Sequence, residues 1–318
     1  MCYKTFQEIL KASGSLGACR MSVAAAHDEH VMEMVKMGME AGLVTPVLAG
    51  DEKKIREIAE GISLSLDGVE IIDTPDPGEA ALEAVRVVSN GMAEILMKGM
   101  VNTSDFMQAV LNRDCGLRNG RILSHMAVFQ IPGFDRLLFI TDGGVNIAPD
   151  LEQKRAILQN GIDLMLDLGW IEPRVAVVTA NEVLNPKMPA TLDAAALARM
   201  AAGGQIHGAL VDGPLSLDMA ISVEAAHRKG SESPVAGRAE LLLMPDIETG
   251  NIFGKSLIYF ARALMAGVVL GTKAPVILTS RASTPEEKLN SMALASLAKL
   301  RSAQTQGEAS CKTPTSSA

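Results

Sequence analysis

A serine and an arginine stand directly after a predicted buried strand near the end of the chain. The apolar run 275–278 in "KAPVILTSRASTPEEKLNS" predicts this strand, and Ser280 and Arg281 follow it. The helix-start pattern "TPEE" at 284–287 comes next. A core strand has no structural need for a guanidinium at its tip, whereas a strand end that faces a helix N-terminus is suited to holding an anion. Arg281 is therefore predicted to bind an anion, with a surface ion pair as the structural alternative.

Polar residues after another predicted strand indicate a second set of anion contacts. Lys98 follows the run 95–97 and can serve as a point charge, although a lysine that extends from a strand end to solvent is the structural alternative. Thr103 and Ser104, together with Asp105, are predicted to cap the next helix and so to present its backbone N–H groups to the same anion.

Polar and glycine-rich loops follow the later strands as well. Asn146 lies in "TDGGVNIAPD", whose glycines allow a ligand to approach the backbone but equally fit a tight turn. Asp212 and Asp246 place carboxylates after two further strands, in "DGPLSLD" and "PDIETGN", and the second loop continues into Gly250 and Asn251 at a predicted helix start. In open α/β sheets ligands bind outside the carboxyl ends of the strands, so these residues are candidates for binding.

The sequence "HDEH" at 27–30 has residue types that bind metals. His27 and His30 are three residues apart and can meet on one helical face. Asp28 and Glu29 are also the residues that a helix N-terminus favours, and we predict this structural role in place of a metal site.

The composition excludes several classes of protein. The 318-residue chain has 29 basic and 37 acidic residues, a net charge of −8, one Trp and two Tyr, so it lacks the basic surface and stacking aromatics of a nucleic-acid-binding protein. Its four cysteines form no CxxC pair, which argues against a zinc site or a disulfide framework and favours a cytoplasmic protein. The N-terminal segment predicts an amphipathic helix in place of a secretion signal.

Short apolar runs alternate with longer helical patterns, which is typical of βα units around a largely parallel sheet. The apolar region 256–279 contains charges and glycines and predicts a helix, a turn and a strand, with no membrane span. The predicted strands are 21–26, 47–49, 69–72, 95–97, 126–130, 137–140, 174–178, 206–211, 240–244 and 275–278.

Several sequence blocks together resemble one enzyme family, the phosphate acetyltransferases and phosphate butyryltransferases. The blocks are "LMKGMVNTSDFMQAVLNRDCGLRNGRILSHMAVFQIP", "LLFITDGGVNIAPDLEQKRAIL", "VDGPLSLDMAIS", "PDIETGNIFGKSLIYFA" and "APVILTSRAS". The butyryl branch is the closer match because of "MKG", "SHMAVF", "NIAPDL" and "SRA", where the acetyl branch typically has "SRG". The resemblance implies the reversible transfer of a short acyl group, preferably butyryl, between coenzyme A and inorganic phosphate.

The resemblance also implies roles for individual residues. A serine, an arginine and a carboxylate seven residues after the serine take part in the reaction of the acetyl branch, and the matching residues here are Ser280, Arg281 and Glu287, with Glu in place of Asp. Glu287 would accept the thiol proton of coenzyme A and Ser280 would hydrogen-bond the thiol or the reacting carbonyl. The residues themselves equally fit a capping box in which Glu287 reaches back to Thr284, so both readings stay open.

Other residues are assigned to the substrates on the same grounds. The acetyl branch has an arginine in a block resembling "TLRPAL", where this chain reads "FMQAVL". Arg113 or Arg118 can substitute for it, and the structural alternative is that both are solvated surface residues. Lys98, Thr103 and Ser104 are assigned to phosphate or to the phosphate groups of coenzyme A, and Asn146 is assigned to the substrate. The loops with Asp212, Asp246, Gly250 and Asn251 would line the coenzyme A side of the cleft or fix the hinge.

The family resembles the fold of isocitrate and isopropylmalate dehydrogenases, which implies a two-domain α/β sandwich with the active site in the cleft. Residues 1–122 and 271–300 would form a discontinuous first domain that carries the Ser-Arg motif, and residues 123–270 the second domain. The small, polar segment 301–318 is predicted to be a flexible tail.

Two other activities are compatible with parts of this pattern. One is phosphate acetyl transfer, and the other is a metal- and NAD(P)-dependent oxidation on the same fold, for which Asp212, Asp218 and Asp246 are the clustered acidic candidates. The favoured reading requires no metal and no cofactor, because coenzyme A is itself substrate or product. Its partners are acyl-CoA, phosphate and acyl phosphate, with neither nucleic acid nor membrane, and the family implies a homo-oligomer.

Overall fold

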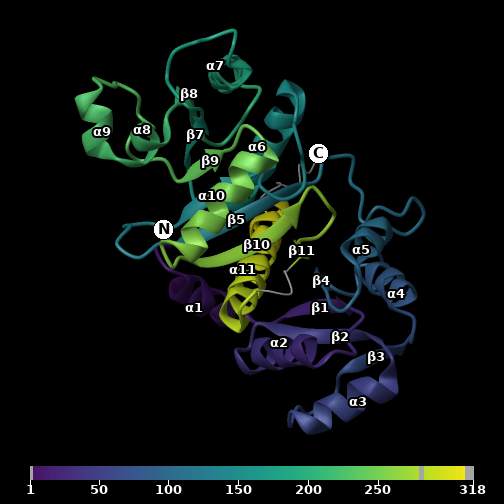
Figure 1. Cartoon of the computed structure of the whole chain (residues 1–318). Helices are drawn as coiled ribbons and strands as arrows, with labels where there is room; N and C mark the ends of the chain where they lie inside the picture. Colours follow the sequence, from purple (N-terminus) through teal and green to yellow (C-terminus); the bar gives the residue numbers. More distant parts are fainter. Residues whose placement is uncertain (1–2, 279–282, 312–318) are drawn as a thin grey trace, which may run out of the picture.

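The predicted alternation of strands and helices forms one large sheet with helices on both faces (Figure 1). A computed structural model describes residues 3–278 and 283–311, with side chains up to residue 299. Within these ranges the sheet has eleven strands: β1 Cys19–Ala24, β2 Val44–Gly50, β3 Glu70–Asp73, β4 Ile95–Lys98, β5 Ser124–Gln130, β6 Leu138–Thr141, β7 Arg174–Val178, β8 Leu210–Leu215, β9 Leu241–Leu243, β10 Leu264–Leu270 and β11 Val276–Ile277.

The strand order β3-β2-β1-β4-β11-β10-β5-β6-β9-β7-β8 contains two parallel groups joined by an antiparallel centre. The first group is β3, β2, β1, β4 and β11, and the second is β6, β9, β7 and β8. Between them, β10 is antiparallel to both β11 and β5, and β5 is antiparallel to β6. These three reversals make the two groups run in opposite directions, so the carboxyl ends of their strands lie at opposite edges of the sheet.

The helices cover the two faces unequally. Those of the described ranges are α1 Phe6–Leu16, α2 Glu29–Glu40, α3 Glu52–Gly61, α4 Pro77–Ser89, α5 Thr103–Val110, α6 Leu151–Asp167, α7 Pro189–Ala202, α8 Leu217–Ile221, α9 Val223–Arg228, α10 Ile247–Tyr259 and α11 Pro285–Cys311. One continuous apolar cluster joins the sheet to α1, α2, α6 and α11. On the opposite face, a cluster under α4 and α5 is separate from a cluster under α8 and α10. The interval between these two clusters is where a recess can form.

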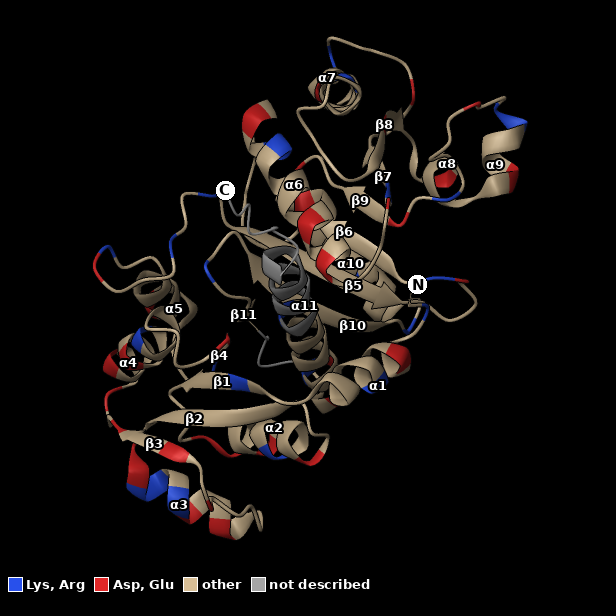
Figure 2. Cartoon of the chain, turned by 180° about the vertical axis from the view of Figure 1, so that it is seen from behind, with Lys and Arg blue, Asp and Glu red and all other residues tan. Residues whose placement is uncertain are grey.

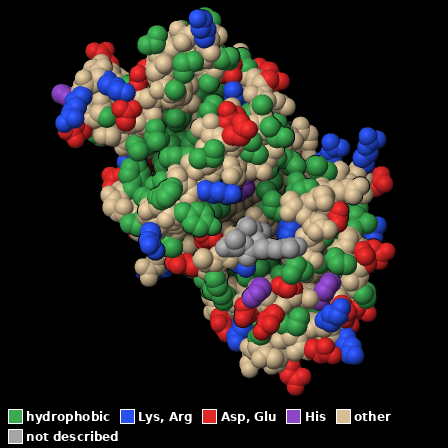
Figure 3. Space-filling view, in the orientation of Figure 1, with side chains coloured by type: hydrophobic (Ala, Val, Ile, Leu, Met, Phe, Trp, Pro, Cys, Tyr) green, Lys and Arg blue, Asp and Glu red, His purple; other side chains and the backbone are tan. Residues whose placement is uncertain are grey.

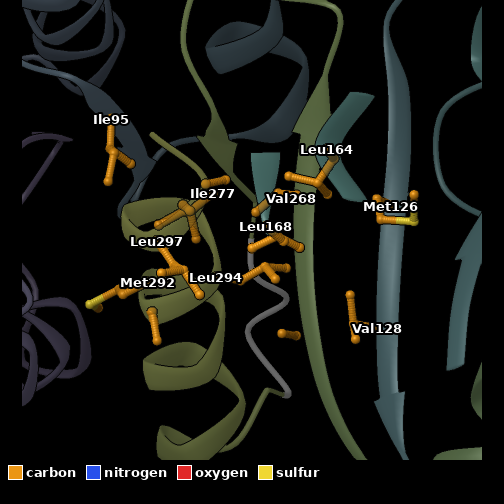
Figure 4. Close-up of a cluster of buried hydrophobic side chains, with 14 of the residues drawn as sticks. Ile95, Met126, Val128, Leu164, Leu168, Val268, Ile277, Met292, Leu294 and Leu297 are labelled. Atoms are coloured by element: carbon orange, nitrogen blue, oxygen red, sulfur yellow. The ribbon is translucent and has the colours of Figure 1, made fainter. Parts of the chain in front are cut away.

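Helix α11 occupies the middle of the continuous cluster. Figure 4 shows Leu294 and Leu297 of this helix on the side of Ile277 and Val268 of the sheet, whereas Met292 points the other way, towards Gly38 of α2. These five side chains are completely buried. Burial of an aliphatic side chain of this size contributes about 1.5–3 kcal/mol, so this contact fixes α11, and with it the first turn of the helix, against the sheet.

Charged side chains lie mainly on the outer faces of the helices. Figure 2 shows this most clearly on α3, whereas the strands at the centre of the molecule are almost free of charge. No helix among the described residues combines the length and the apolarity needed to cross a membrane.

The structure corrects two predicted strands. The strand expected at 206–211 lies at Leu210–Leu215 and includes Gly213 and Pro214, which were expected to end it. Proline lacks an N–H donor but is tolerated at the edge of a sheet, and β8 is an edge strand. The region read as a turn after α10 contains the strand β10, with Gly267 inside it.

Two predicted helix ends also differ. Asn102 is the N-cap of α5, so Thr103, Ser104 and Asp105 form its first turn and are not its cap. Helix α11 continues to Cys311 and therefore includes residues 301–311 of the segment expected to be a tail.

Candidate functional site

A cavity of about 510 Å³ lies on the sheet face that carries α5 and α10. Around the hollow in the middle of Figure 3, hydrophobic side chains gather together with basic and histidine side chains. The cavity is lined by Thr103, His125, Ala127, Phe129, Ile140, Gly143, Gly144, Gly250, Asn251, Gly254, Lys255, Ile258, Tyr259, Met265, Gly267, Leu278, Ser283, Glu287 and Ser291. The predicted candidates among these are Thr103, Gly250, Asn251 and Glu287.

The floor of the cavity is the surface of β10, β5 and β6. Gly267, Ala127 and Ile140 form one row across these three strands. Met265 and Phe129 lie opposite each other in the adjacent row. In the first row the His125 ring lies over Gly267, so the free space is above the small side chain of Ala127, and the other side chains of the floor are apolar. This floor can accept a small apolar group.

Helix α10 forms one wall because its N-terminus approaches the loop after β6 very closely. A Cβ on Gly250 would lie 2.8 Å from the carbonyl oxygen of Asp142, and one on Gly143 would lie 2.8 Å from the carbonyl carbon of Gly250. Asn251 Nδ2 donates to the Gly143 carbonyl at 3.2 Å. Lys255 lies one helical turn further on and places an exposed ammonium on the same cavity.

The first turns of α11 form a second wall. Thr284 N donates to Glu287 Oε2 at 3.0 Å, and Glu287 N donates to Thr284 Oγ1 at 3.2 Å. The predicted capping box is therefore confirmed, while the same Glu287 side chain also lines the cavity. One turn later, Ser291 Oγ accepts from Gly267 N at 2.9 Å and donates to the Glu287 carbonyl at 2.9 Å. Ser291 thus ties the beginning of α11 to the floor strand β10.

The loop after β6 is held together by the buried Asp142. Its carboxylate accepts from Gly144 N at 2.8 Å, from Val145 N at 2.9 Å and from Asn146 Nδ2 at 2.6 Å. Asn146 Nδ2 also donates to the Leu123 carbonyl at 2.7 Å. Asn146 does not line the cavity, and its bonds favour the tight-turn reading of this loop over direct ligand contact.

Of the other residues predicted to contact an anion, Thr103 lines the cavity, whereas Lys98 and Ser104 are not among its lining residues. Thr103 is exposed. Lys98 is half-buried at the end of β4, where its Nζ donates to the Gly99 carbonyl at 3.2 Å. Ser104 Oγ bonds Asp105 Oδ1 at 3.3 Å, within the first turn of α5.

The acidic candidates are not brought together. Asp212 is inside β8 and accepts from Gly213 N at 2.8 Å. Asp246 is the N-cap of α10 and accepts from Thr249 N at 2.8 Å. Asp218 pairs with Lys229 Nζ at 3.0 Å. In the described part of the chain, no group of three or more His, Cys, Asp or Glu residues could hold a metal ion.

The residues of "HDEH" also have separate structural partners. His27 Nδ1 accepts from Asp51 N at 3.1 Å, and burial lowers the pKa of this histidine. His30 pairs with Glu33 at 3.5 Å. Asp28 is the N-cap of α2, as predicted.

Ser280 and Arg281 lie outside the described residues. Leu278 and Ser283, the nearest described residues on either side of them, both line the cavity.

The prediction from sequence missed His125 and Lys255. Both have a signal in the sequence. His125 shares its strand face with Ala127 and Phe129 by the two-residue alternation of a strand, and Lys255 follows Asn251 by four residues on a helix. The face that is turned to the cavity is set by packing, which the alternation alone does not reveal.

Comparison with known proteins agrees with this site and fold. Residues 77–296 match the family model described as "Phosphate acetyl/butaryl transferase". The phosphate butyryltransferase of Clostridium acetobutylicum is 47% identical over 294 residues, which cover 92% of this chain and 98% of that protein. The phosphate acetyltransferase of Thermotoga maritima is 45% identical over 278 residues, covering 87% and 94%.

A solved structure is similar over the same length. The branched-chain phosphotransacylase from Enterococcus faecalis superposes with a TM-score of 0.76 at 30% identity, covering 88% of this chain and 99% of that one. The mixed α/β fold with its large sheet is thus that of a phosphotransacylase. The chain belongs to the phosphate acetyl/butyryl transferase family.

Proposed function

We propose that this protein transfers a short acyl group, with butyryl favoured, reversibly between coenzyme A and inorganic phosphate, and that the cavity described above is its active site. The observation that carries the proposal is the composition of this cavity. It combines an apolar floor with Lys255, Thr103 and Glu287, and the nearest described residues on either side of Ser280 and Arg281, Leu278 and Ser283, belong to its wall. Membership of the family over most of the chain supports the same reaction.

The reaction requires the kinds of groups that surround the floor. An oxygen of phosphate attacks the thioester carbonyl, the carbon–sulfur bond breaks, and the thiolate of coenzyme A takes up a proton. Two negatively charged partners must therefore be brought together, and cations lower the cost of that approach. Arg281 supplies the planar donors that phosphate oxygens match, and the Lys255 ammonium adds a point charge. No metal or nicotinamide is required for these steps.

The acyl chain is assigned to the floor of the cavity. The His125 ring lies over Gly267, so the space for the chain is above Ala127, where Phe129, Met265 and Ile140 supply apolar groups. A short apolar chain gains free energy there by leaving water. We propose that the remainder of coenzyme A follows the adjoining groove of about 610 Å³, which shares Ile258 and Glu287 with the cavity.

The architecture is proposed to be the two-domain fold of isocitrate and isopropylmalate dehydrogenases. The two parallel strand groups, joined through β5 and β10, support a division into residues 1–122 with 271–300 and residues 123–270. The active-site cleft would then lie between the domains. A homo-oligomer in the cytoplasm remains part of the proposal, and light scattering that finds only a 33.6 kDa species would contradict the oligomer.

The oxidoreductase alternative loses its support in the structure. It requires the carboxylates of Asp212, Asp218 and Asp246 to act together, and each of them has a separate structural partner.

The experiment mixes the protein with butyryl-CoA and phosphate and follows free thiol with a colour reagent. Thiol release that depends on phosphate and survives a chelator is expected. Absence of release with acetyl-, propionyl- and butyryl-CoA alike would refute the proposed function. Release that stops with the chelator would refute the proposal that no metal takes part.

A further inference from the structure

His125 presents an imidazole to the cavity from its floor strand. In β5 the side chains of Met126 and Val128 enter the continuous core, as Figure 4 shows, so His125 shares the opposite face with Ala127 and Phe129. All three of these residues line the cavity. Among the described residues of this floor, His125 is the only titratable side chain, and it is directed at the space assigned to the acyl group.

Two glycines make room for this ring. A Cβ on Gly144 would lie 3.0 Å from His125 Cγ, and a Cβ on Gly267 would lie 3.0 Å from His125 Nε2. Real Cβ atoms seldom approach that closely, so a side chain at either position would displace the imidazole. The imidazole therefore lies between the backbone at Gly144 and the backbone at Gly267, which together set its orientation, and it also lines the cavity.

The half-buried imidazole has no hydrogen-bond partner among the described residues. The nearby Asp142 carboxylate is occupied by the backbone of its own loop and by Asn146. Glu287, the other candidate for a proton acceptor in this cavity, already accepts from Thr284 N in the capping box. A ring nitrogen of His125 is therefore available to a substrate.

We propose that His125 carries the thiol proton in this reaction, an inference that rests on the proposed acyl transfer. In the direction from acyl phosphate, an imidazole nitrogen takes the proton as the S–H bond breaks and sulfur attacks the carbonyl carbon. The tetrahedral intermediate then expels phosphate, and the carbon–oxygen bond to phosphate breaks. The departing phosphate oxygen receives the proton from the imidazolium, which returns His125 to its neutral form. In the opposite direction the proton passes from phosphate to the thiolate.

The charges around the ring suit this role. Burial lowers the pKa of His125, and the negative charge of Asp142 opposes that effect, so the resting ring is neutral near pH 7 and can accept a proton. The other charged groups that face the cavity are Lys255 of α10 and Glu287 of α11. Asp142 stabilises the imidazolium once it forms, which is the role that a carboxylate has beside a catalytic histidine.

The test compares wild type with His125→Gln and His125→Asn in the reaction of butyryl phosphate with coenzyme A. Both amides can donate a hydrogen bond, but neither can carry a proton. We expect kcat to fall by about 10²–10⁴ while KM for butyryl phosphate stays within about threefold. The ratio of wild-type to variant kcat should decrease as the pH falls through the histidine pKa, because the protonated wild-type ring no longer accepts a proton.

His207→Gln is the matched control, since this histidine is exposed and lies outside the cavity. Its kcat should equal that of wild type at every pH. If either His125 variant keeps kcat within about threefold of wild type, or if the ratio does not change with pH, His125 does not carry the proton. If wild type itself releases no thiol with any acyl-CoA, the proposed function fails before this test is reached.

Discussion

At the scale of single residues, Glu287 shows how one side chain can have a structural contact and a place in the site at once. Its carboxylate closes the capping box with Thr284, and the same residue lines the cavity. Proximity to the cavity does not establish a chemical role, because the capping contact alone accounts for the presence of the residue. The two roles make different predictions for substitution.

The variant Glu287→Gln distinguishes the capping role of Glu287 from a chemical role. Glutamine can still accept from Thr284 N but cannot accept a proton, so stability should be unchanged under either reading. If His125 carries the proton, turnover of the Gln variant should stay within about threefold of wild type, whereas loss of a general base costs about 10²–10⁴ in rate. Thr284→Ala is the matched structural control and should lower the free energy of unfolding by about 1 kcal/mol.

Arg281→Lys tests the predicted anion contact. Lysine keeps the charge but loses the planar pair of donors that matches phosphate oxygens. We expect kcat/KM for phosphate to fall by more than about tenfold, with little change in melting temperature. Equal kinetics for the Lys variant would show that a point charge is sufficient at this position.

At the scale of elements, the beginning of α11 and the strand β10 depend on each other. The N–H of Gly267 has no strand partner on that side and donates instead to Ser291 Oγ. Together with the apolar contacts of α11, this bond holds the wall of the cavity that carries Glu287 against the floor that carries Ala127 and His125. The geometry of the site therefore depends on a buried hydroxyl that takes no part in the proposed chemistry.

Ser291→Ala leaves the Gly267 N–H buried without an acceptor. The expected loss in the free energy of unfolding is about 1–3 kcal/mol, measured by denaturant titration. Ser296→Ala is the matched control on the same helix, because Ser296 Oγ only donates to the Leu43 carbonyl, which also accepts from Cys19 N. Ser296→Ala is expected to lose less free energy of unfolding than Ser291→Ala. Equal losses in the two variants would contradict the proposed link between α11 and β10.

A second element-scale contact fixes the loop after β7 to α8 and α9. Lys229 Nζ pairs with Glu182 at 2.9 Å and with Asp218 at 3.0 Å, and Ser216 Oγ lies within hydrogen-bond distance of both carboxylates. The Ser216 hydroxyl and then Lys229 lower the pKa of Asp218 to about 2. Since a lowered folded-state pKa favours folding only while the carboxylate is charged, its contribution is present above the unfolded value near pH 3.9.

The stability that the charged Asp218 carboxylate contributes should disappear as the pH falls through about 2. The melting temperature of Asp218→Asn should therefore lie below that of wild type at pH 6, and the difference should vanish near pH 2. Glu60→Gln, on the exposed surface of α3, is the control and should follow wild type throughout. A difference for Asp218→Asn that stays constant with pH would contradict the assignment.

At the scale of the whole molecule, the antiparallel pair β5 and β10 both joins the two strand groups and forms the floor of the cavity. The small side chain of Ala127 in the central row leaves space for the acyl chain, and Gly267 beside it makes room for the His125 ring. The depth of that space, and hence the preferred chain length, is a property of three strands and a helix from distant parts of the sequence.

Chain-length preference should consequently be graded. Each buried methylene contributes about 0.8 kcal/mol, so two methylenes separate butyryl from acetyl by roughly tenfold in kcat/KM. Ala127→Leu should fill the central row and reverse the order in favour of acetyl-CoA. Specificity constants measured for acetyl-, propionyl- and butyryl-CoA test this. A steady decrease from acetyl to butyryl in wild type would contradict both the butyryl preference and the position of the chain.

The sequence by itself determined the local elements of this protein and its family. Apolar periodicity predicted nearly every strand, and the residues of "TPEE" and Asp28 predicted two helix starts correctly, because hydrogen bonds between a cap and its own first turn involve only near neighbours. The ordered blocks from "LMKGMV" to "SRAS" predicted the family that the matching model confirms.

Only the tertiary structure decided which of the polar loops meet. A parallel sheet was predicted to bring all strand ends to one edge, but the reversals at β10, β5 and β6 send the carboxyl ends of β4 and β9, and with them Lys98 and Asp246, to opposite edges. The same reversals turn His125 and Ala127 towards Gly267, which follows them by more than a hundred residues in the sequence. Strand direction and strand neighbours depend on which apolar faces pack together in three dimensions, and a one-dimensional pattern of burial is identical for a strand and its reverse.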